Sequence, residues 1–317
     1  MRLSLRLICL LMLLPAAFPA WGQEDLQPFV FTPQWMPQAQ FAGYYVAKEK
    51  GFYAEEGLDV TIVHPSSTET ASVRILNGNS DATTMQLVQA LEMLDMDIPL
   101  VNILQTSMEN GLVLVSRHGT EPMKMRGARV ATWQVGFDQI AQCMAAEKKL
   151  EYEWIQTADL LNLYIFNAVD ATLAMSYNEY YQLLQTGLVD SENHVFRFSD
   201  NGYDIQEDGI YMMREKYETD PDRAMRFARA SRRGWEWAAD HREETVEIVM
   251  EYVKREYAAT NRVLQQLMLD EILRLQLAKD TGEQEFRLRP EMVEAASELM
   301  YKNGMIRRPV KLEELLP

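Results

Sequence analysis

Residues 35–60 read WMPQAQFAGYYVAKEKGFYAEEGLDV, and this stretch decides the fold. It follows a short run of β-branched and aromatic residues, 29–32, that predicts a strand. Within it, residues 39–50 carry aromatic side chains at helical spacing, and Gly51 is a natural helix stop. Residues 58–63 then predict a second strand. A strand, a helix and a strand in this order predict a parallel β-α-β unit.

The alternation continues along the chain and then restarts. Strand and helix patterns follow one another up to a strand at residues 112–116, and a second series runs from a strand at 127–132 to a helix at 179–186. From Asp220 onward the pattern is almost entirely helical. We therefore predict an α/β fold with two lobes, built from mainly parallel sheets flanked by helices, and with a helical C-terminal region.

Because the second series interrupts the first, the chain must cross between the lobes twice. The predicted division assigns residues 23–115 and 199–317 to a discontinuous first lobe, and residues 116–198 to a second lobe. Two lobes connected in this way close around a ligand at the hinge, and small-molecule sites favour that crevice.

The N-terminus is typical of a secretory signal. Arg2 and Arg6 supply positive charge, residues 7–14 form a short apolar run, and small residues lead up to Gly22. The run is too short to span a bilayer comfortably. We predict that residues 1–22 are a cleaved signal peptide and that the mature protein is periplasmic.

Charge and motif content argue against several classes of function. A net charge of −16 disfavours binding to nucleic acid or to anionic lipid. His64, His118, His194 and His241 are scattered without the spacing of a metal site, and the chain has no nucleophile elbow or phosphate-binding loop. Cys143 is expected to be a buried apolar residue rather than a nucleophile. We expect no metal, no cofactor and no catalytic residue.

Three clusters of aromatic, amide and acidic side chains each follow a predicted strand. The clusters contain Trp35, Gln38, Gln40, Phe41 and Tyr44; then Trp133, Gln134, Phe137 and Asp138; then Tyr177, Asn178, Glu179, Tyr180 and Tyr181. In open α/β sheets, ligands bind beyond the carboxyl ends of the strands. A planar ligand suits such clusters, because rings stack on Trp or Tyr while amides and carboxylates bind its polar edge.

Each candidate also has a purely structural explanation. Trp35 and Trp133 could equally well pack in the core. Glu179 lies at a helix start, where the helix dipole stabilises an acid whatever its function. Asp208 is by default a turn residue, although it could also face the cleft.

Several motifs resemble those of the thiamine-pyrimidine family of type II periplasmic binding folds. These motifs are Trp35-Met36-Pro37, Ala42-Gly43-Tyr44-Tyr45-Val46-Ala47, Lys50-Gly51-Phe52-Tyr53 and Glu56-Gly57-Leu58-Asp59-Val60, followed by Gly78 to Asp81, Arg126 to Val130, Asp170-Ala171, Tyr177-Asn178-Glu179 and Glu207-Asp208-Gly209. That family includes solute-binding proteins for formylaminopyrimidine, relatives that bind alkanesulfonates or riboflavin, and a yeast enzyme that makes the pyrimidine of thiamine.

The resemblance implies roles for individual residues. Trp35 matches the family's ring-stacking Trp, and Tyr177 and Glu179 match a tyrosine and a carboxylate that face an aminopyrimidine. Phe41 stands where the family often has His. Met85 and Gln89 fall where the yeast enzyme uses a Lys and a His, and the cysteine run of that enzyme is missing. We count Met85 among the expected ligand contacts.

The sequence therefore predicts an extracytoplasmic solute-binding protein of an ABC transporter. Its expected ligand is a small planar nitrogen heterocycle such as a thiamine pyrimidine precursor, and its expected partner is an ABC permease in the inner membrane. The protein is expected to be a monomer. Three alternatives remain open: a binder of sulfonates or other small solutes, a ligand sensor partnered with a membrane receptor, and a diverged pyrimidine synthase.

Overall fold

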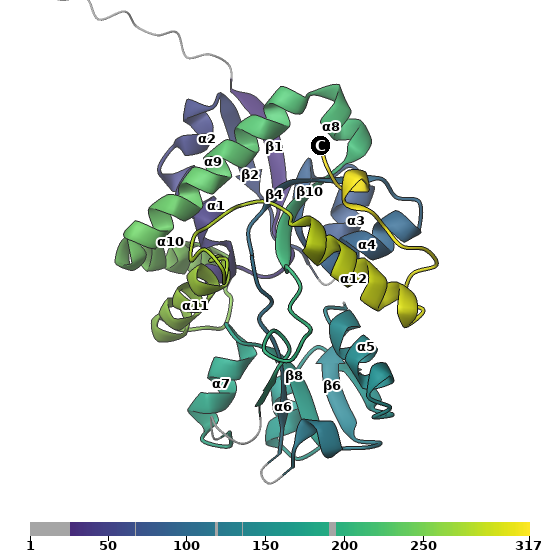
Figure 1. Cartoon of the computed structure of the whole chain (residues 1–317). Helices are drawn as coiled ribbons and strands as arrows, with labels where there is room; N and C mark the ends of the chain where they lie inside the picture. Colours follow the sequence, from purple (N-terminus) through teal and green to yellow (C-terminus); the bar gives the residue numbers. More distant parts are fainter. Residues whose placement is uncertain (1–25, 67, 118–119, 135, 190–194) are drawn as a thin grey trace, which may run out of the picture.

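The computed structural model describes residues 26–66, 68–117, 120–134, 136–189 and 195–317. The residues 1–22 predicted as a signal peptide lie outside these ranges. The described chain forms two α/β lobes, one above the other in Figure 1. In this described part, no helix combines the length and apolar character needed to cross a bilayer.

The first lobe contains a five-stranded sheet of order β2-β1-β3-β10-β4. Its strands are β1 (Gln27–Thr32), β2 (Leu58–Ile62), β3 (Ala82–Gln86), β4 (Leu100–Gln105) and β10 (Asp208–Met213). Its helices are η1 (Ala39–Phe41), α1 (Ala42–Glu49), α2 (Phe52–Glu55), α3 (Ala71–Leu76), α4 (Leu87–Asp95), α8 (Arg214–Thr219), α9 (Pro221–Asp240), α10 (Arg242–Arg255), α11 (Arg262–Leu275), α12 (Pro290–Lys302) and η3 (Leu312–Glu314). The predicted helical C-terminal region thus completes this lobe, with α9 packed along α1 and α2.

The second lobe contains the sheet β7-β6-β8-β5-β9. Its strands are β5 (Leu112–Ser116), β6 (Arg129–Trp133), β7 (Glu153–Thr157), β8 (Ala171–Met175) and β9 (Val195–Arg197). Its helices are η2 (Pro122–Lys124), α5 (Gln139–Glu147), α6 (Leu160–Ile165) and α7 (Glu179–Thr186). The predicted two-lobed α/β architecture is therefore confirmed.

The predicted boundary between residues 115 and 116 needs correction. Strand β5 pairs with β8 and β9, so the chain leaves the first sheet after Gln105 and has entered the second sheet by Leu112. The apolar run Leu112–Ser116 identifies a buried strand, but nothing in that run tells which of two similar sheets it joins.

Parallel pairing holds only for part of each sheet. The pairs β1–β2, β1–β3, β6–β7 and β6–β8 are parallel, whereas β10 and β5, which follow the two crossings, pair antiparallel with their neighbours. An antiparallel strand starts where its parallel neighbours end. Asp208 at the start of β10 is accordingly opposite Gln86 at the end of β3, and Leu112 is opposite Met175. Both crossings therefore lie at the edges where ligands bind in α/β sheets.

Candidate functional site

A narrow crevice lies between the lobes, at the carboxyl ends of the parallel strands. Its lining combines four aromatic side chains with several side-chain amides and a single carboxylate. The lining residues are Gln34, Trp35, Gln38, Gln40, Gln86, Trp133, Phe137, Met175, Tyr177, Asn178 and Glu179. Both lobes contribute, so the crevice is complete only when they lie together.

The loop after β1 presents Trp35 to the crevice. The backbone N–H of Gln34 donates to Thr84 Oγ1 at 2.8 Å, and the Trp35 carbonyl accepts from His64 Nδ1 at 2.7 Å. His64 Nε2 lies 3.0 Å from the Tyr45 hydroxyl and accepts its hydrogen bond. Burial lowers the pKa of His64 to about 4, so the ring is neutral at physiological pH and serves to hold this loop.

The second lobe places two further rings opposite Trp35. Trp133 is the last residue of β6, and Phe137 follows in the left-handed backbone region with φ +76°. The Phe137 ring lies edge-on to Trp35, with centroids 6.0 Å apart, and edge-on to Trp133 at 6.1 Å. A non-glycine residue with positive φ is uncommon and often marks a functional position. Here it brings Phe137 between the two Trp side chains.

Glu179 is the carboxylate of the crevice. It opens α7, and its Oε2 accepts from the backbone N–H of Met175 at 3.0 Å. Its Oε1 lies 3.3 Å from both Trp133 Nε1 and Asn178 Nδ2, which donate to it. Burial raises the pKa of Glu179 despite these donors. The side chain is thus fixed in place beside the aromatic rings.

A hydrogen-bonded network lies behind the crevice and joins the lobes. Asp208 accepts from Gln34 Nε2 at 2.8 Å and from Gln40 Nε2 at 2.7 Å. Gln40 Nε2 also lies 3.1 Å from the Tyr177 hydroxyl, which donates to Glu207 Oε1 at 2.8 Å. Burial, together with the neighbouring Asp208, raises the pKa of Glu207 to about 8. Asp208 and Glu207 are the two buried acids of this network, and none of the residues that form it is a cation.

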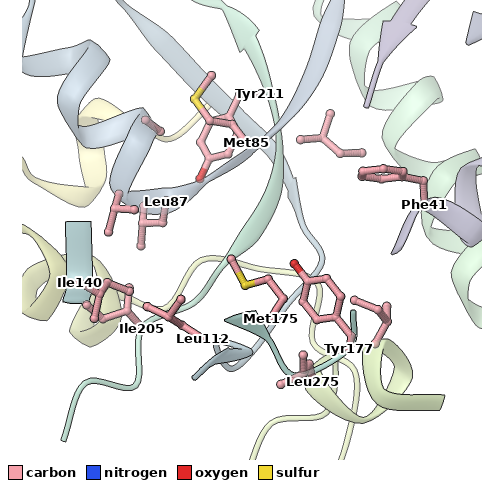
Figure 2. Close-up of a cluster of buried hydrophobic side chains, with 14 of the residues drawn as sticks. Phe41, Met85, Leu87, Leu112, Ile140, Met175, Tyr177, Ile205, Tyr211 and Leu275 are labelled. Atoms are coloured by element: carbon pink, nitrogen blue, oxygen red, sulfur yellow. The ribbon is translucent and has the colours of Figure 1, made fainter. Parts of the chain in front are cut away.

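The structure brings most of the predicted residues to one place. Those that line the crevice are Trp35, Gln40, Trp133, Tyr177, Asn178 and Glu179. Asp208 lies immediately behind them and holds Gln34 and Gln40. Figure 2 shows the Tyr177 hydroxyl pointing from the second lobe toward the first, with Met175 beside it.

Three predicted residues lie elsewhere, in the core of the first lobe. Phe41 is fully buried beside His64, with ring centroids 6.0 Å apart. Tyr44 packs edge-on against Phe31 and Trp235, because the helical spacing of the aromatics turns it toward α9. Met85 is buried on β3 opposite Gly209 of β10. Figure 2 shows Phe41 and Met85 apart from the Met175–Tyr177 end of the cluster.

Other crevice residues were not named as predicted ligand contacts, although Gln38 and Phe137 belong to the candidate clusters. They are Gln34, Gln38, Gln86, Phe137 and Met175. Gln34 and Gln38 flank Trp35 in sequence, and Phe137 belongs to the cluster after β6, so proximity to a candidate Trp was the available signal. Gln86 and Met175 end strands β3 and β8, and only the strand boundaries could have indicated them.

A family model described as NMT1/THI5 like matches residues 38–245. The chain belongs to the NMT1/THI5-like family. Among curated relatives, the formylaminopyrimidine-binding protein of Halalkalibacterium halodurans is 23% identical over 243 residues, 73% of this chain and 72% of that protein. The putative binding protein YtlA of Bacillus subtilis is 24% identical over 241 residues, 71% and 70% of the two chains.

Solved structures resemble the whole two-lobed chain. The periplasmic aliphatic sulphonate-binding protein SsuA of Escherichia coli has a TM-score of 0.66 and 13% identity, with 92% of each chain covered. The alkanesulfonate-binding protein SsuA of Xanthomonas axonopodis pv. citri, bound to MOPS, has a TM-score of 0.68 and 12% identity, over 90% of this chain and 96% of that chain. This member of the NMT1/THI5-like family therefore has the periplasmic-binding-protein fold and is related to solute-binding proteins.

Proposed function

We propose that the protein is the solute-binding component of an ABC transporter and binds a small planar nitrogen heterocycle, such as a thiamine pyrimidine precursor. The observation that carries this proposal is the convergence of Trp35, Trp133 and Phe137 from two lobes on one crevice beside Glu179. A flat ring binds between aromatic faces, and its ring nitrogens and amino groups bind amides and carboxylates.

The free space within the crevice is about 20 Å³, below the range of small-molecule sites, so a ligand can enter only when the lobes or the lining side chains move apart. The similarity to the formylaminopyrimidine-binding protein of Halalkalibacterium halodurans supports a planar heterocyclic ligand of this kind.

A sulfonate ligand receives less support from the lining. Sulfonates require cationic side chains or several N–H donors, and none of the described residues that line the crevice is Lys or Arg. The two arginines closest to the predicted cleft in sequence are paired elsewhere, Arg74 with Glu69 at 2.5 Å and Arg129 with Asp170 at 3.5 Å.

Binding without chemistry fits two side chains that could have carried a reaction. Met85, which aligns with the catalytic Lys of the pyrimidine synthase, is buried in the first sheet. Burial raises the pKa of the Cys143 thiol to about 12, so this side chain is not a thiolate at neutral pH. If the ligand is recovered chemically unchanged by mass spectrometry after prolonged incubation, the absence of a catalytic step is supported; a converted product would contradict it.

The binding experiment is a calorimetric titration of the mature protein with formylaminopyrimidine, thiamine, riboflavin and an alkanesulfonate. We expect binding of a pyrimidine and no binding of the sulfonate. Trp35→Ala should weaken the pyrimidine by at least about tenfold, roughly 1.4 kcal/mol. The control is Trp154→Ala, a half-buried Trp on β7 whose ring lies edge-on to Tyr152. Binding of the sulfonate alone, or equal effects of the two Trp variants, would contradict the proposed site.

Transport is tested separately from binding. Cells lacking this gene should lose uptake of the labelled pyrimidine at low concentration, and expression of the full chain should restore it. Uptake unchanged by the deletion, with tight binding retained by the purified protein, would favour a sensor over a transport component.

A further inference from the structure

The crevice presents hydrogen-bond acceptors rather than donors. Gln34 Nε2 and Gln40 Nε2 both donate to Asp208, which uses their N–H groups within the protein. Gln34 Oε1 is buried and has no hydrogen-bond partner. A buried acceptor without a partner is destabilising, and a ligand N–H group placed there would satisfy it.

Three buried carboxyl groups add to this acceptor character. Glu179 accepts from a backbone N–H and two neutral side chains, Glu207 from Tyr177 and Gly111, and Asp208 from two glutamines. No Lys, Arg or His is among the described hydrogen-bond partners of these three groups. Burial raises the pKa of all three. Glu207 avoids the cost of an unpaired buried charge by keeping its proton, whereas an ionised Glu179 or Asp208 would be stabilised by a nearby cation.

The aromatic rings of the crevice are also arranged to bind a cation. Trp35 and Trp133 each lie edge-on to Phe137, at interplanar angles of 74° and 83°. Rings set nearly at right angles around one space form a partial cage, and the faces of aromatic rings attract cations, most strongly for Trp. Trp133 Nε1 also donates to Glu179, which places the carboxylate beside this cage.

We propose that the ligand binds as a cation, with a protonated amine or a quaternary nitrogen between the rings of Trp35, Trp133 and Phe137 and beside the Glu179 carboxylate. This inference rests on the proposed function and specifies the charge of its ligand. It makes the ligand the positive partner that the Glu179 carboxylate lacks among its described hydrogen-bond partners. It also accounts for the absence of Lys and Arg from the described lining, since either would repel such a ligand.

The test uses two probes that differ in charge at one position. One is the pyrimidine with a free aminomethyl group, which is protonated at neutral pH, and the other is its neutral N-formyl derivative, formylaminopyrimidine. Calorimetric titration of the mature wild-type protein at pH 7 should give at least about tenfold tighter binding of the amine. Equal or tighter binding of the neutral derivative would overturn the cation proposal and leave the proposed function intact.

Variants then identify the residue responsible. Glu179→Gln should reduce amine binding by at least about tenfold more than it reduces binding of the formyl derivative; equal losses for both would overturn the cation proposal. Glu153→Gln on β7 is the matched control and should leave both affinities unchanged. Because the wild-type comparison needs no substitution, misfolding of Glu179→Gln would leave the test decisive. Failure of both pyrimidines to bind would overturn the inference and the proposed function together.

Discussion

Phe41 was predicted to contact the ligand, but its side chain is buried in the core of the first lobe. It stands where related sequences often have His, and it lies six residues after Trp35. The structure buries its ring completely beside His64, which itself holds the Trp35 loop. Position 41 therefore acts on the crevice only through its packing against the residues that support that loop.

We expect Phe41→His to destabilise the protein and to leave ligand affinity within about threefold of wild type. A polar ring at this fully buried position costs roughly 1–3 kcal/mol unless it finds a partner. Denaturant unfolding measures the loss, and Phe166→His on the exposed end of α6 is the control, since Phe166 is 77% exposed. A tenfold gain in pyrimidine affinity would show that position 41 reaches the ligand.

Glu207 makes a second prediction at the residue scale. Burial, with Asp208 nearby, raises its pKa from 4.5 to about 8, so between these pH values the folded state binds a proton that the unfolded state releases. Its contribution to the free energy of unfolding is therefore full below about pH 4.5 and is lost as the pH rises toward 8. This change is on the order of 1 kcal/mol or more.

Glu207→Gln should remove that pH dependence. We expect the difference in melting temperature, wild type minus variant, to fall between pH 5 and pH 8 because the variant cannot lose a proton. Glu153→Gln, on the outer strand of the second sheet, should give a difference that does not change with pH. A constant difference for Glu207→Gln as well would mean that this carboxyl group has an ordinary pKa.

At the scale of elements, one of the motifs that revealed the family packs α1 against α9. A Cβ added to Gly43 would lie 2.3 Å from the Trp235 ring, and one added to Gly234 would lie 2.0 Å from the Gly43 carbonyl oxygen. The two glycines allow these helices to approach closely. The motif Ala42-Gly43-Tyr44-Tyr45 is thus explained by packing and makes no contact with the crevice.

Gly43→Ala should therefore destabilise the protein by about 1–3 kcal/mol through overpacking, without removing any group that lines the crevice. Chemical denaturation measures the loss. The double variant Gly43→Ala with Trp235→Leu replaces the obstructing ring with a smaller side chain, so its loss should be smaller than the sum of the two single losses. Strict additivity would contradict the proposed contact.

The elements of the fold were predictable because their signals are local. The strand at 29–32, the helix at 39–50 and Gly51, observed at φ +77°, follow from propensity and spacing. The choice of sheet for β5 was not local, since it depends on pairing with β8 about sixty residues later. The crevice was predicted in part: Trp35 and Glu179 end or follow strands, whereas Phe41 and Met85 are turned into the core by contacts that the sequence does not reveal.

For the whole molecule, closure of the lobes completes the crevice. Contacts between lobes lie on both sides of it: Gln139 Nε2 donates to Glu92 at 2.9 Å, and Ser176 Oγ donates to Glu271 on α11 at 2.7 Å. In Figure 1, α5 lies below α12 on one side, and α7 lies below α11 on the other. The free energy of these contacts adds to that of the ligand in favouring the closed state.

Ser176→Ala tests this coupling, because Ser176 belongs to the second lobe, makes its contact with the first and does not line the ligand crevice. Loss of one hydrogen bond of about 0.5–1.5 kcal/mol should reduce ligand affinity by roughly two- to tenfold, since binding must then supply more of the free energy of closure. Small-angle scattering should show a larger ligand-free protein and the same compact liganded form. Ser199→Ala is the control, because the described hydrogen bond of its hydroxyl is to the adjacent Asp200, at 3.5 Å, and does not join the lobes. If both variants bind like wild type, the Ser176–Glu271 contact does not contribute to closure, and affinity is set within the crevice alone.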